Sequence, residues 1–332
     1  MSEQTNSYYL SIVIVNYRTP KLTIDCLKSL ASEIDGLPPT RVIVVDNHSE
    51  DDSVSLIKDA IALSSWEDWA FVIESEVNGG FSYGNNLGIK TVKAENYLLL
   101  NSDTIVRSGS IKILLEAINK YHRAGIVSPR LEWLDGEPQI SCFRNRSPLN
   151  ELINSAKTGA ITKILHKYDV PLPVTDQAID VEWTSFACVL IRHKVIEQIG
   201  LMDEGYFMYF DDIDYCRRIK EAGWQIIHYP FARVVHLRGG SGSVKKDISL
   251  KKRPPEYLYA SRSRYFTKFY GIFGLWMANL LWLVGRSISY TREIIERKPP
   301  QTCTLEARDI WLNWYNPLKP YLKENKKDEQ KA

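Results

Sequence analysis

The alternation of apolar runs with amphipathic segments over the first 130 residues is the feature that most restricts the fold. A β-branched and aromatic run begins at Tyr8 and ends at Asn16, as is typical of a strand covered on both faces. The next segment has Pro20 at its start and apolar residues at helical spacing. The same order recurs up to Tyr121. We therefore predict βαβ units that build an α/β fold, an open and mostly parallel sheet flanked by helices.

Polar residues stand where the predicted strands end, at Asn16, at Asp46 with Asn47, and from Asn101 to Asp103. Ligands of open parallel sheets bind beyond the carboxyl ends of the strands, so we expect a ligand site there. A glycine-rich stretch over residues 78–88 also permits close backbone approach. It lacks the glycine order of a dinucleotide fingerprint or a P-loop, and a purely structural turn is the alternative.

Bulk composition narrows the choice of partners and compartment. A net charge of +2 gives no field that would favour nucleic acid. The 5 cysteines are scattered and odd in number, which disfavours a disulfide framework and a structural zinc site. The first residues do not resemble a secretory signal. We expect a cytoplasmic protein.

Two acidic segments are candidates for chemistry. Asp103 follows an apolar strand, where a carboxylate can bind a hard divalent cation or simply cap the next helix. Asp211, Asp212 and Asp214 begin a predicted helix after an aromatic cluster. They exceed what the helix dipole requires. Partial desolvation by aromatic neighbours suits a carboxylate to accept a proton, and Asp212 is our candidate base.

Basic residues near the end of the predicted sheet add two hypotheses. His236 ends an apolar strand and can join Asp103 in a metal site, although a structural histidine is the simpler interpretation. Arg238, Arg262 and Arg264 carry forked donors that suit diphosphate oxygens. Solvated surface arginines are the alternative.

The segments SIVIVNYRT, VIVVDNHSEDDS, NGGFSYGNNLG, LLLNSDT, VEWTSFACVLIRH, FMYFDDIDYCRR and ARVVHLRGGS occur in one order. This ordered set, over about residues 9–270, resembles glycosyltransferase family 2, in particular its bacterial rhamnosyltransferase-like members. The resemblance implies a GT-A fold and inverting transfer of a sugar from a nucleotide-diphosphate donor. The chain departs from the family pattern at two positions. Asn101 stands where the family usually has Asp, and Asp211 stands where it usually has Glu.

The resemblance also implies roles for individual residues. Asp103 and His236 would hold Mg²⁺ or Mn²⁺, and Asp212 would be the catalytic base. The acceptor side would include Asp211 and Tyr209. Residues implied to bind the donor nucleotide are Asn16, Asp46, Asn78, Gly79, Gly80, Asn86, Asn101 and Ser102. From the chemistry of their side chains, our candidates for contact with the donor diphosphate or sugar are Arg238, Arg262, Arg264 and Trp183, the last with a core role as the alternative.

The expected domain organisation follows from this resemblance and from the composition of the rest of the chain. Residues 1–250 would form the GT-A catalytic domain, with a nucleotide-binding half over about 1–130 and an acceptor-binding half over about 131–250. A helical appendage would cover 251–300 and a charged tail 301–332. The apolar run 269–285 is too short for a comfortable bilayer span. It suits a helix in a membrane interface, or one packed on protein.

The expected substrates are a dTDP-rhamnose donor, with UDP-sugars open, and a saccharide or lipid-linked saccharide acceptor in bacterial surface polysaccharide synthesis. The expected location is the inner face of the cell membrane, peripherally attached, and a homodimer is left open. Two other functions compete: a non-catalytic nucleotide-sugar binding module, and a glycoside hydrolase with paired carboxylates.

Overall fold

The computed structural model of the protein describes residues 8–238 and 244–321. The chain divides into two compact units that interleave along the sequence. The sheet unit comprises Met1–Phe143, Pro173–Asp203 and Asp212–Ser241. The helical unit comprises Arg144–Leu172, Glu204–Asp211 and Gly242–Ala332. This division differs from the sequential boundary that we expected near residue 250, because two internal segments pack with the C-terminal helices.

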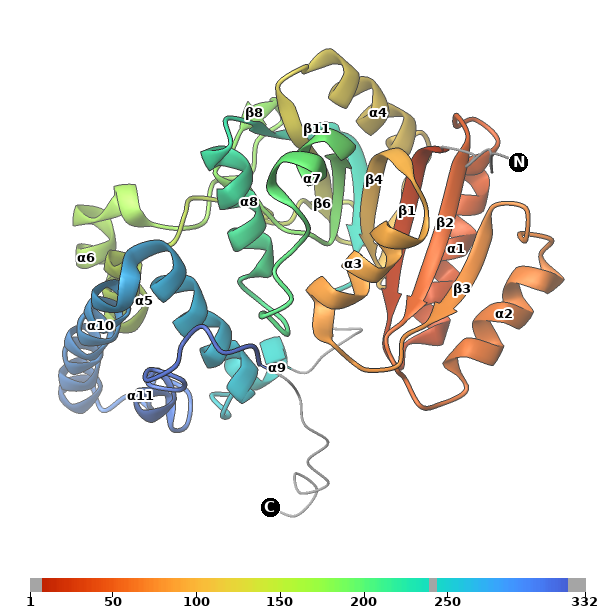
Figure 1. The fold of residues 1–332 in the computed structure, drawn as a ribbon. Helices are drawn as coiled ribbons and strands as arrows, with labels where there is room; N and C mark the ends of the chain where they lie inside the picture. The colour runs from red at the N-terminus through yellow and green to blue at the C-terminus, as the bar shows by residue number, and fades with distance from the viewer. Residues whose placement is uncertain (1–7, 239–243, 322–332) are drawn as a thin grey trace. The chain divides into compact units, whose positions relative to one another are not determined.

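A mixed, mostly parallel sheet forms the centre of the sheet unit (Figure 1). In the described residues its strand order is β3-β2-β1-β4-β10-β6-β11-β5, with β8 paired to β11. The strands are β1 (Tyr8–Asn16), β2 (Thr40–Asp46), β3 (Ala70–Glu74), β4 (Ala94–Asn101), β5 (Thr104–Val106), β6 (Ala124–Glu132), β8 (Ile179–Asp180), β10 (Cys188–Arg192) and β11 (Gln225–His236). The first four strands in this order are parallel to one another, as the βαβ rhythm predicts, whereas β10 pairs with β4 in the antiparallel direction.

Helices cover the two faces of this sheet because the side chains of each strand alternate. In β1, Leu10, Ile12 and Ile14 belong to a core that includes residues of α1 (Pro20–Ile34), α2 (Ser53–Leu63) and α4 (Ser110–Lys120). Val13 and Val15 of the same strand face α3 (Gly80–Thr91). Figure 1 shows α1 and α3 on opposite sides of the sheet. The unit also contains α7 (His193–Ile199) and most of α8 (Asp211–Glu221).

Glycines inside α3 allow it to lie close to the sheet. A Cβ on Gly88 would be 2.3 Å from Cγ1 of Val13, and one on Gly84 would be 2.9 Å from Cγ1 of Val15. Real Cβ atoms do not approach other carbons so closely, so both positions require glycine. Part of the glycine-rich stretch is therefore explained by packing.

The helical unit is built around α10 (Glu256–Glu296), which packs on α5 (Pro148–Ala156). Gly271 has a φ of 68° and kinks α10. The remaining helices of the described part of this unit are α6 (Gly159–Ile164), the 3-10 turn η1 (His166–Tyr168), α9 (Val244–Ser249) and α11 (Glu306–Asp309). The predicted C-terminal helical appendage is therefore confirmed.

Two stretches of strand in the second half of the sheet unit are irregular. Over residues 183–192 the chain forms two short strands, β9 (Trp183–Thr184), which pairs with β7 (Cys142–Phe143), and β10. Over residues 225–236 it forms the single strand β11, with a register irregularity between Tyr229 and Arg233. Pro230 lies in this interval and lacks the N–H that a regular ladder needs. The chain continues in the same direction instead of turning back.

We predict that Gly88→Ala lowers the free energy of unfolding by about 1–3 kcal/mol, the usual range for overpacking. Helix propensity alone would favour alanine by about 1 kcal/mol, so the sign of the change separates packing from propensity. Gly36→Ala is the matched control, because the nearest atom to its Cβ would be 3.6 Å away. Equilibrium denaturant unfolding measures both, and a Gly88→Ala protein as stable as the wild type would contradict the packing explanation.

Candidate active site

The carboxyl ends of three parallel strands meet at one edge of the sheet. Asn16 of β1 pairs with Asp46 of β2, and Val15 pairs with Asn101 of β4. Ser102 and Asp103 follow β4 directly, and both are buried. The structure therefore brings together the polar strand ends that the sequence predicted.

Asp46 is held by a buried hydrogen-bond cluster. Its Oδ2 accepts from Asn16 Nδ2 and from Ser49 Oγ, each at 2.7 Å, and its Oδ1 accepts from the Ser49 N–H at 2.9 Å. Thr23 Oγ1 donates to Asn16 Oδ1 at 2.8 Å. Because these contacts fix both side chains, the edge formed by Asn16 and Asp46 is rigid.

A second cluster fixes the start of α3 against β2. Asn47 Nδ2 donates to Asn78 Oδ1 at 3.0 Å and to the Gly80 carbonyl at 3.1 Å. A Cβ on Gly79 would collide with the Tyr83 ring at 2.3 Å, and Gly80 has a φ of 85°. Asn47 directly follows Asp46 and is one of the polar strand-end residues that the sequence indicated.

Asn86 joins α3 to the loop after α7. Its Nδ2 donates to the Met202 carbonyl at 2.9 Å, and its Oδ1 accepts from the Met202 N–H at 3.1 Å. The side chain is 1% exposed. These contacts give Asn86 a structural function, and its predicted contact with a nucleotide stays a prediction.

Asp103 and His236 lie together because β5 and β11 are paired. Thr104 is opposite His236 in this antiparallel pair, and the Leu237 N–H donates to the Asp103 carbonyl at 2.9 Å. His236 Nε2 is 3.4 Å from Asp103 Oδ1, and the two side chains are only 10% and 2% exposed. Two residues far apart in the sequence thus present an imidazole and a carboxylate at one point.

Gln139 fixes the backbone at His236 through hydrogen bonds, and sequence reasoning missed this residue. Its Nε2 donates to the His236 carbonyl at 2.7 Å and to the Glu132 carbonyl at 3.0 Å. A glutamine that bonds backbone carbonyls from another loop has no local sequence signal. It fixes the end of β11 and therefore the direction in which the imidazole leaves the strand.

Other groups complete this edge of the sheet. Thr104 Oγ1 donates to the Asn101 carbonyl at 2.7 Å, and Ser102 Oγ lies 3.3 Å from Thr19 Oγ1. The Cys26 thiol contacts the Asn101 carbonyl. Its burial raises the pKa to about 12, so this thiol stays protonated and unreactive.

Arg238 follows β11 and lies beside Trp133. Its guanidinium carbon is 5.5 Å from the centre of the Trp133 ring, and one Nη donates to the Ile140 carbonyl at 2.8 Å. Burial lowers the pKa of this guanidinium. Its Nε is buried and has no hydrogen-bond partner among the described residues, which leaves a donor for an anion.

Asp103 and His236 are chemically suited to a divalent cation, since carboxylate oxygen and imidazole nitrogen both bind such ions. Neither Asp103 Oδ1 nor His236 Nδ1 has a hydrogen-bond partner within the described chain. No group of three or more His, Cys, Asp or Glu that could hold a metal occurs in the part of the chain that the structure describes. A cation here would therefore take further ligands from a substrate or from water.

The carboxylates of the acidic helix α8 differ in their burial and in their contacts. Asp214 is fully buried and ion-paired with Arg218 at 2.9 Å, so it is structural. Asp212 is half-buried, and its Oδ1 accepts from the Ile213 N–H at 2.8 Å. Its convergence with Asp103 and His236 stays a prediction.

The two residues before α8 have an unusual backbone. Tyr209 and Phe210 have φ values of 67° and 66°, a region that side chains other than glycine rarely adopt. Tyr209 stacks on Tyr257 with the ring centres 6.3 Å apart, and Asp211 is buried. Strained backbone of this kind clusters at functional sites.

Three residues that we predicted to bind the donor make contacts with other residues of the protein. Trp183 is buried and stacks on Phe143 at 4.0 Å between ring centres. Arg262, 5% exposed, donates to Glu151 at 2.9 Å and to Asn279 at 2.6 Å. Arg264 stacks on Tyr206 and donates to the Leu318 carbonyl. These contacts give Arg262 and Arg264 structural roles inside the helical unit.

The sequence comparison shows the family to which the chain belongs. Residues 8–254 match the family described as glycosyltransferase like family 2, so the chain belongs to that family. Among its relatives, the low-salt glycan biosynthesis hexosyltransferase Agl10 of Haloferax volcanii is 29% identical over 70% of this chain and 69% of its own.

Two further relatives are named rhamnosyltransferases. The N-acetylglucosaminyl-diphospho-decaprenol L-rhamnosyltransferase of Mycobacterium tuberculosis is 27% identical over 60% of this chain and 63% of its own. The rhamnosyltransferase WbbL of Escherichia coli is 25% identical over 47% of this chain and 60% of its own. The chain thus spans less than two thirds of either relative. The predicted resemblance to rhamnosyltransferase-like members is confirmed.

Solved structures establish the GT-A fold. GalNAc-T7 with UDP, GalNAc and Mn²⁺ superposes with a TM-score of 0.56 at 14% identity, over 93% of this chain and 58% of that one. The mannosyltransferase PcManGT from Pyrobaculum calidifontis with GDP-Man and Mn²⁺ gives 0.51 at 12% identity, over 95% and 86%. The predicted fold class is confirmed.

We predict that Arg262→Met lowers the free energy of unfolding by about 3–5 kcal/mol, because it leaves Glu151 buried without its partner. The double variant Arg262→Met with Glu151→Leu recovers most of this loss. Arg297→Gln, at an exposed position of the same helical unit, is the control and changes stability by less than about 0.5 kcal/mol. Denaturant unfolding measures all three. A fully stable Arg262→Met protein that has lost donor binding would restore the original prediction for Arg262.

Proposed function

We propose that the protein is a metal-dependent, inverting glycosyltransferase that transfers a sugar, with rhamnose favoured, from a nucleoside-diphosphate donor to a hydroxyl of a saccharide or lipid-linked acceptor in bacterial surface polysaccharide synthesis. The observation that carries the proposal is the pairing of Asp103 with His236 beyond the strand ends of a family 2 chain. The carboxylate–imidazole pair is buried and has unsatisfied polar atoms, as a cation site requires.

The names of relatives support the choice of substrates. Two of them are named rhamnosyltransferases, which favours dTDP-rhamnose as the donor, with UDP-sugars as the second class. The mycobacterial name includes a diphospho-decaprenol carrier. This favours an acceptor linked through a diphosphate to a lipid.

Mg²⁺ or Mn²⁺ bound by Asp103 and His236 would neutralise charge on the departing diphosphate. Mn²⁺ is present in the structures of GalNAc-T7 and PcManGT, which supports a divalent ion. Asn101 stands where the family usually has an acid, so this chain would use Asp103 and His236 as its protein ligands.

The chain's own residues would divide the remaining work. Asn16 and Asp46 would present a fixed polar edge to the nucleoside, and the free Arg238 Nε–H would donate to a diphosphate oxygen. Asp212 would accept the proton of the acceptor hydroxyl as that oxygen attacks. Attack on the face opposite to the leaving diphosphate inverts the anomeric carbon.

The two competing functions make different predictions. A non-catalytic binding module would bind the donor and metal without transfer. A glycoside hydrolase would act without nucleotide or metal. Membership of family 2 favours transfer over both.

The second half of α10 supports a place at the cytoplasmic face of a membrane. After the kink, Phe273, Met277, Leu280, Val284 and Ile288 recur every three or four residues and are 40–86% exposed. One helix of the described chain, α10, is long and apolar enough to cross a membrane. Such an apolar stripe on a folded surface suits insertion into a lipid interface.

Aromatic residues continue this surface. Trp276 and Trp314 are 41% and 44% exposed, and their ring centres are 5.7 Å apart. Tyr315 is 78% exposed and lies against Trp314. Tryptophan and tyrosine prefer the boundary between headgroups and hydrocarbon, so we propose that α10 lies in the plane of the interface.

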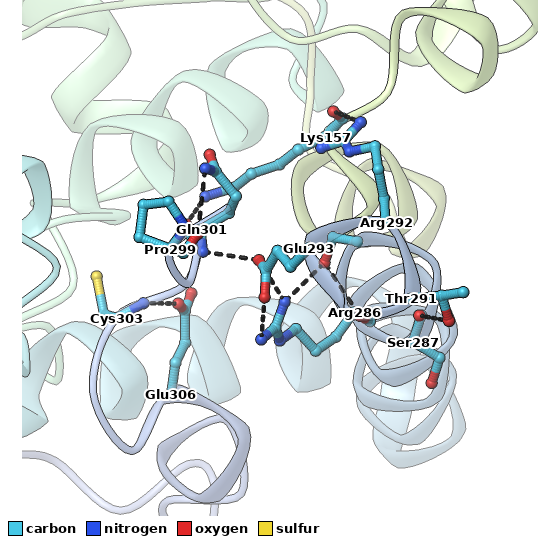
Figure 2. A network of polar contacts seen from close by, with 11 residues as sticks. Lys157, Arg286, Ser287, Thr291, Arg292, Glu293, Pro299, Gln301, Cys303 and Glu306 are labelled. Atoms are coloured by element: carbon cyan, nitrogen blue, oxygen red, sulfur yellow. Dashed lines mark hydrogen bonds and ion pairs between the residues drawn. The ribbon is translucent and has the colours of Figure 1, made fainter. Parts of the chain in front are cut away.

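The opposite face of α10 argues against a spanning orientation. Gly285 lies against the backbone of α5, where its Cβ would be 2.6 Å from the Leu152 carbonyl. Figure 2 shows Arg286 paired with Glu293, at 2.7 and 2.9 Å, while the Gln301 N–H donates to the same carboxylate at 2.7 Å. A helix that crossed the bilayer would bring these charges into hydrocarbon, at high cost.

We predict that Mn²⁺ together with dTDP- or UDP-sugars raises the melting temperature, because a ligand bound only by the folded state stabilises it. Asp103→Asn loses the metal-dependent part of this shift. Asp212→Asn keeps the full shift but loses transfer. Differential scanning fluorimetry and a transfer assay with and without EDTA measure these effects. Normal transfer by Asp212→Asn would refute its role as base, and metal-independent transfer would refute the cation site.

We predict that the triple variant Phe273→Ser, Met277→Ser and Leu280→Ser lowers binding to phosphatidylglycerol vesicles at least about tenfold, because each buried apolar side chain contributes about 1.5–3 kcal/mol. The control is Leu63→Ser with Phe231→Ser, two exposed apolar residues of the sheet unit. Co-sedimentation measures binding. If instead the triple variant changes only the oligomeric state in size-exclusion chromatography, the surface binds a second copy.

A further inference from the structure

Arg146 is a half-buried cation without an acidic partner. It lies in the helical unit just before α5, and its guanidinium carbon is 5.2 Å from the centre of the Phe210 ring. Its Nε is buried and makes no hydrogen bond among the described residues. No ion pair within the described residues includes Arg146. The cation–π contact is thus its main polar interaction.

Two other partly buried arginines show the usual arrangement, in which the guanidinium has protein partners. Arg218 pairs with Asp214 and donates to the carbonyls of Ile199 and Leu201. Arg253 pairs with Asp309. A buried donor left without a partner costs free energy and is uncommon in folded proteins. Arg130 and Arg238 also have a buried Nε without a partner among the described residues, but Arg130 is ion-paired with Asp176. Within the same part of the chain, Arg146 lacks both an ion pair and a partner for its Nε, which indicates a group that binds there.

The backbone of Arg146 is fixed from the other side. Its carbonyl accepts from Tyr265 Oη at 3.0 Å and from Tyr270 Oη at 2.7 Å. Pro148 begins α5 two residues later, so the positive end of that helix dipole lies next to Arg146 in the chain. The guanidinium is held in place before any ligand arrives, which lowers the entropy lost on binding.

We propose that Arg146 binds a phosphate of a diphosphate-containing substrate. The planar fork of arginine donates two parallel bonds to phosphate oxygens, and stacking on an aromatic ring keeps the plane oriented. A carboxylate ligand would use the same donors, but diphosphate is the anion that both proposed substrates share.

The diphosphate can come from the sugar-nucleotide donor or from the lipid-linked acceptor, because the proposed function gives both substrates this group. The link to a substrate, unlike the anion site itself, rests on the proposed function.

The experiment measures binding before catalysis. Inorganic pyrophosphate is titrated in EDTA into the full-length wild type, Arg146→Gln, Arg146→Lys and the control Arg297→Gln, with isothermal calorimetry as the readout. We expect Arg146→Gln to weaken binding at least about tenfold, the size of a charge-assisted hydrogen bond. Arg146→Lys gives an intermediate value because it keeps the charge but not the fork. Arg297→Gln binds like the wild type.

Two further arms identify the source of the diphosphate. If Arg146→Gln raises the KM for a short-chain N-acetylglucosaminyl diphospholipid but not the Kd for UDP with Mn²⁺, the acceptor is the ligand. If the Kd for UDP with Mn²⁺ rises instead, the donor is the ligand. Equal pyrophosphate affinity in the wild type and Arg146→Gln, with both proteins folded by circular dichroism, overturns the proposal. An Arg146-dependent pyrophosphate site in a protein without transferase activity would leave the anion site standing and refute the proposed function.

Discussion

The antiparallel pairing of β5 with β11 is the constraint on which the candidate active site depends. β5 is short, but its register sets Thr104 against His236 and so carries Asp103 to the imidazole. The parallel strands on the other side of β4 can form without this contact, and they supply only the polar edge around Asp46. The proposed cation site therefore exists only where a local βαβ sheet meets a strand from much later in the chain.

Local sequence patterns were sufficient for the first half of the sheet. The apolar alternation in β1 specifies which side chains face α1 and which face α3, so the pattern itself encodes the layers. The polar strand ends followed from the same reasoning, because parallel strands place their carboxyl ends together. The sequence alone did not decide whether the glycines of residues 78–88 serve ligand binding or packing. The structure shows that Gly84 and Gly88 serve helix packing, whereas Gly79 and Gly80 lie at the start of α3.

Contacts between distant residues could not be predicted in the same way. Gln139 bonds a carbonyl 97 residues away, and Arg262 pairs with Glu151 across 111 residues. No local pattern distinguishes an arginine that binds phosphate from one that neutralises a buried carboxylate. For that reason Arg262 was a candidate and Arg146 was not, although Arg146, unlike Arg262, has no acidic partner among the described residues.

The interleaving of the two units along the chain also bears on how the protein is made. The parallel strands β1 to β4 use only residues 8–101, so a ribosome can release a foldable sheet early. The helical unit draws on three separated stretches of chain, and α10 follows every strand of the sheet. In consequence, a nascent chain completes the polar edge around Asp46 first and acquires the histidine later. The exposed apolar stripe of α10 emerges only after the strands of the sheet are available to fold.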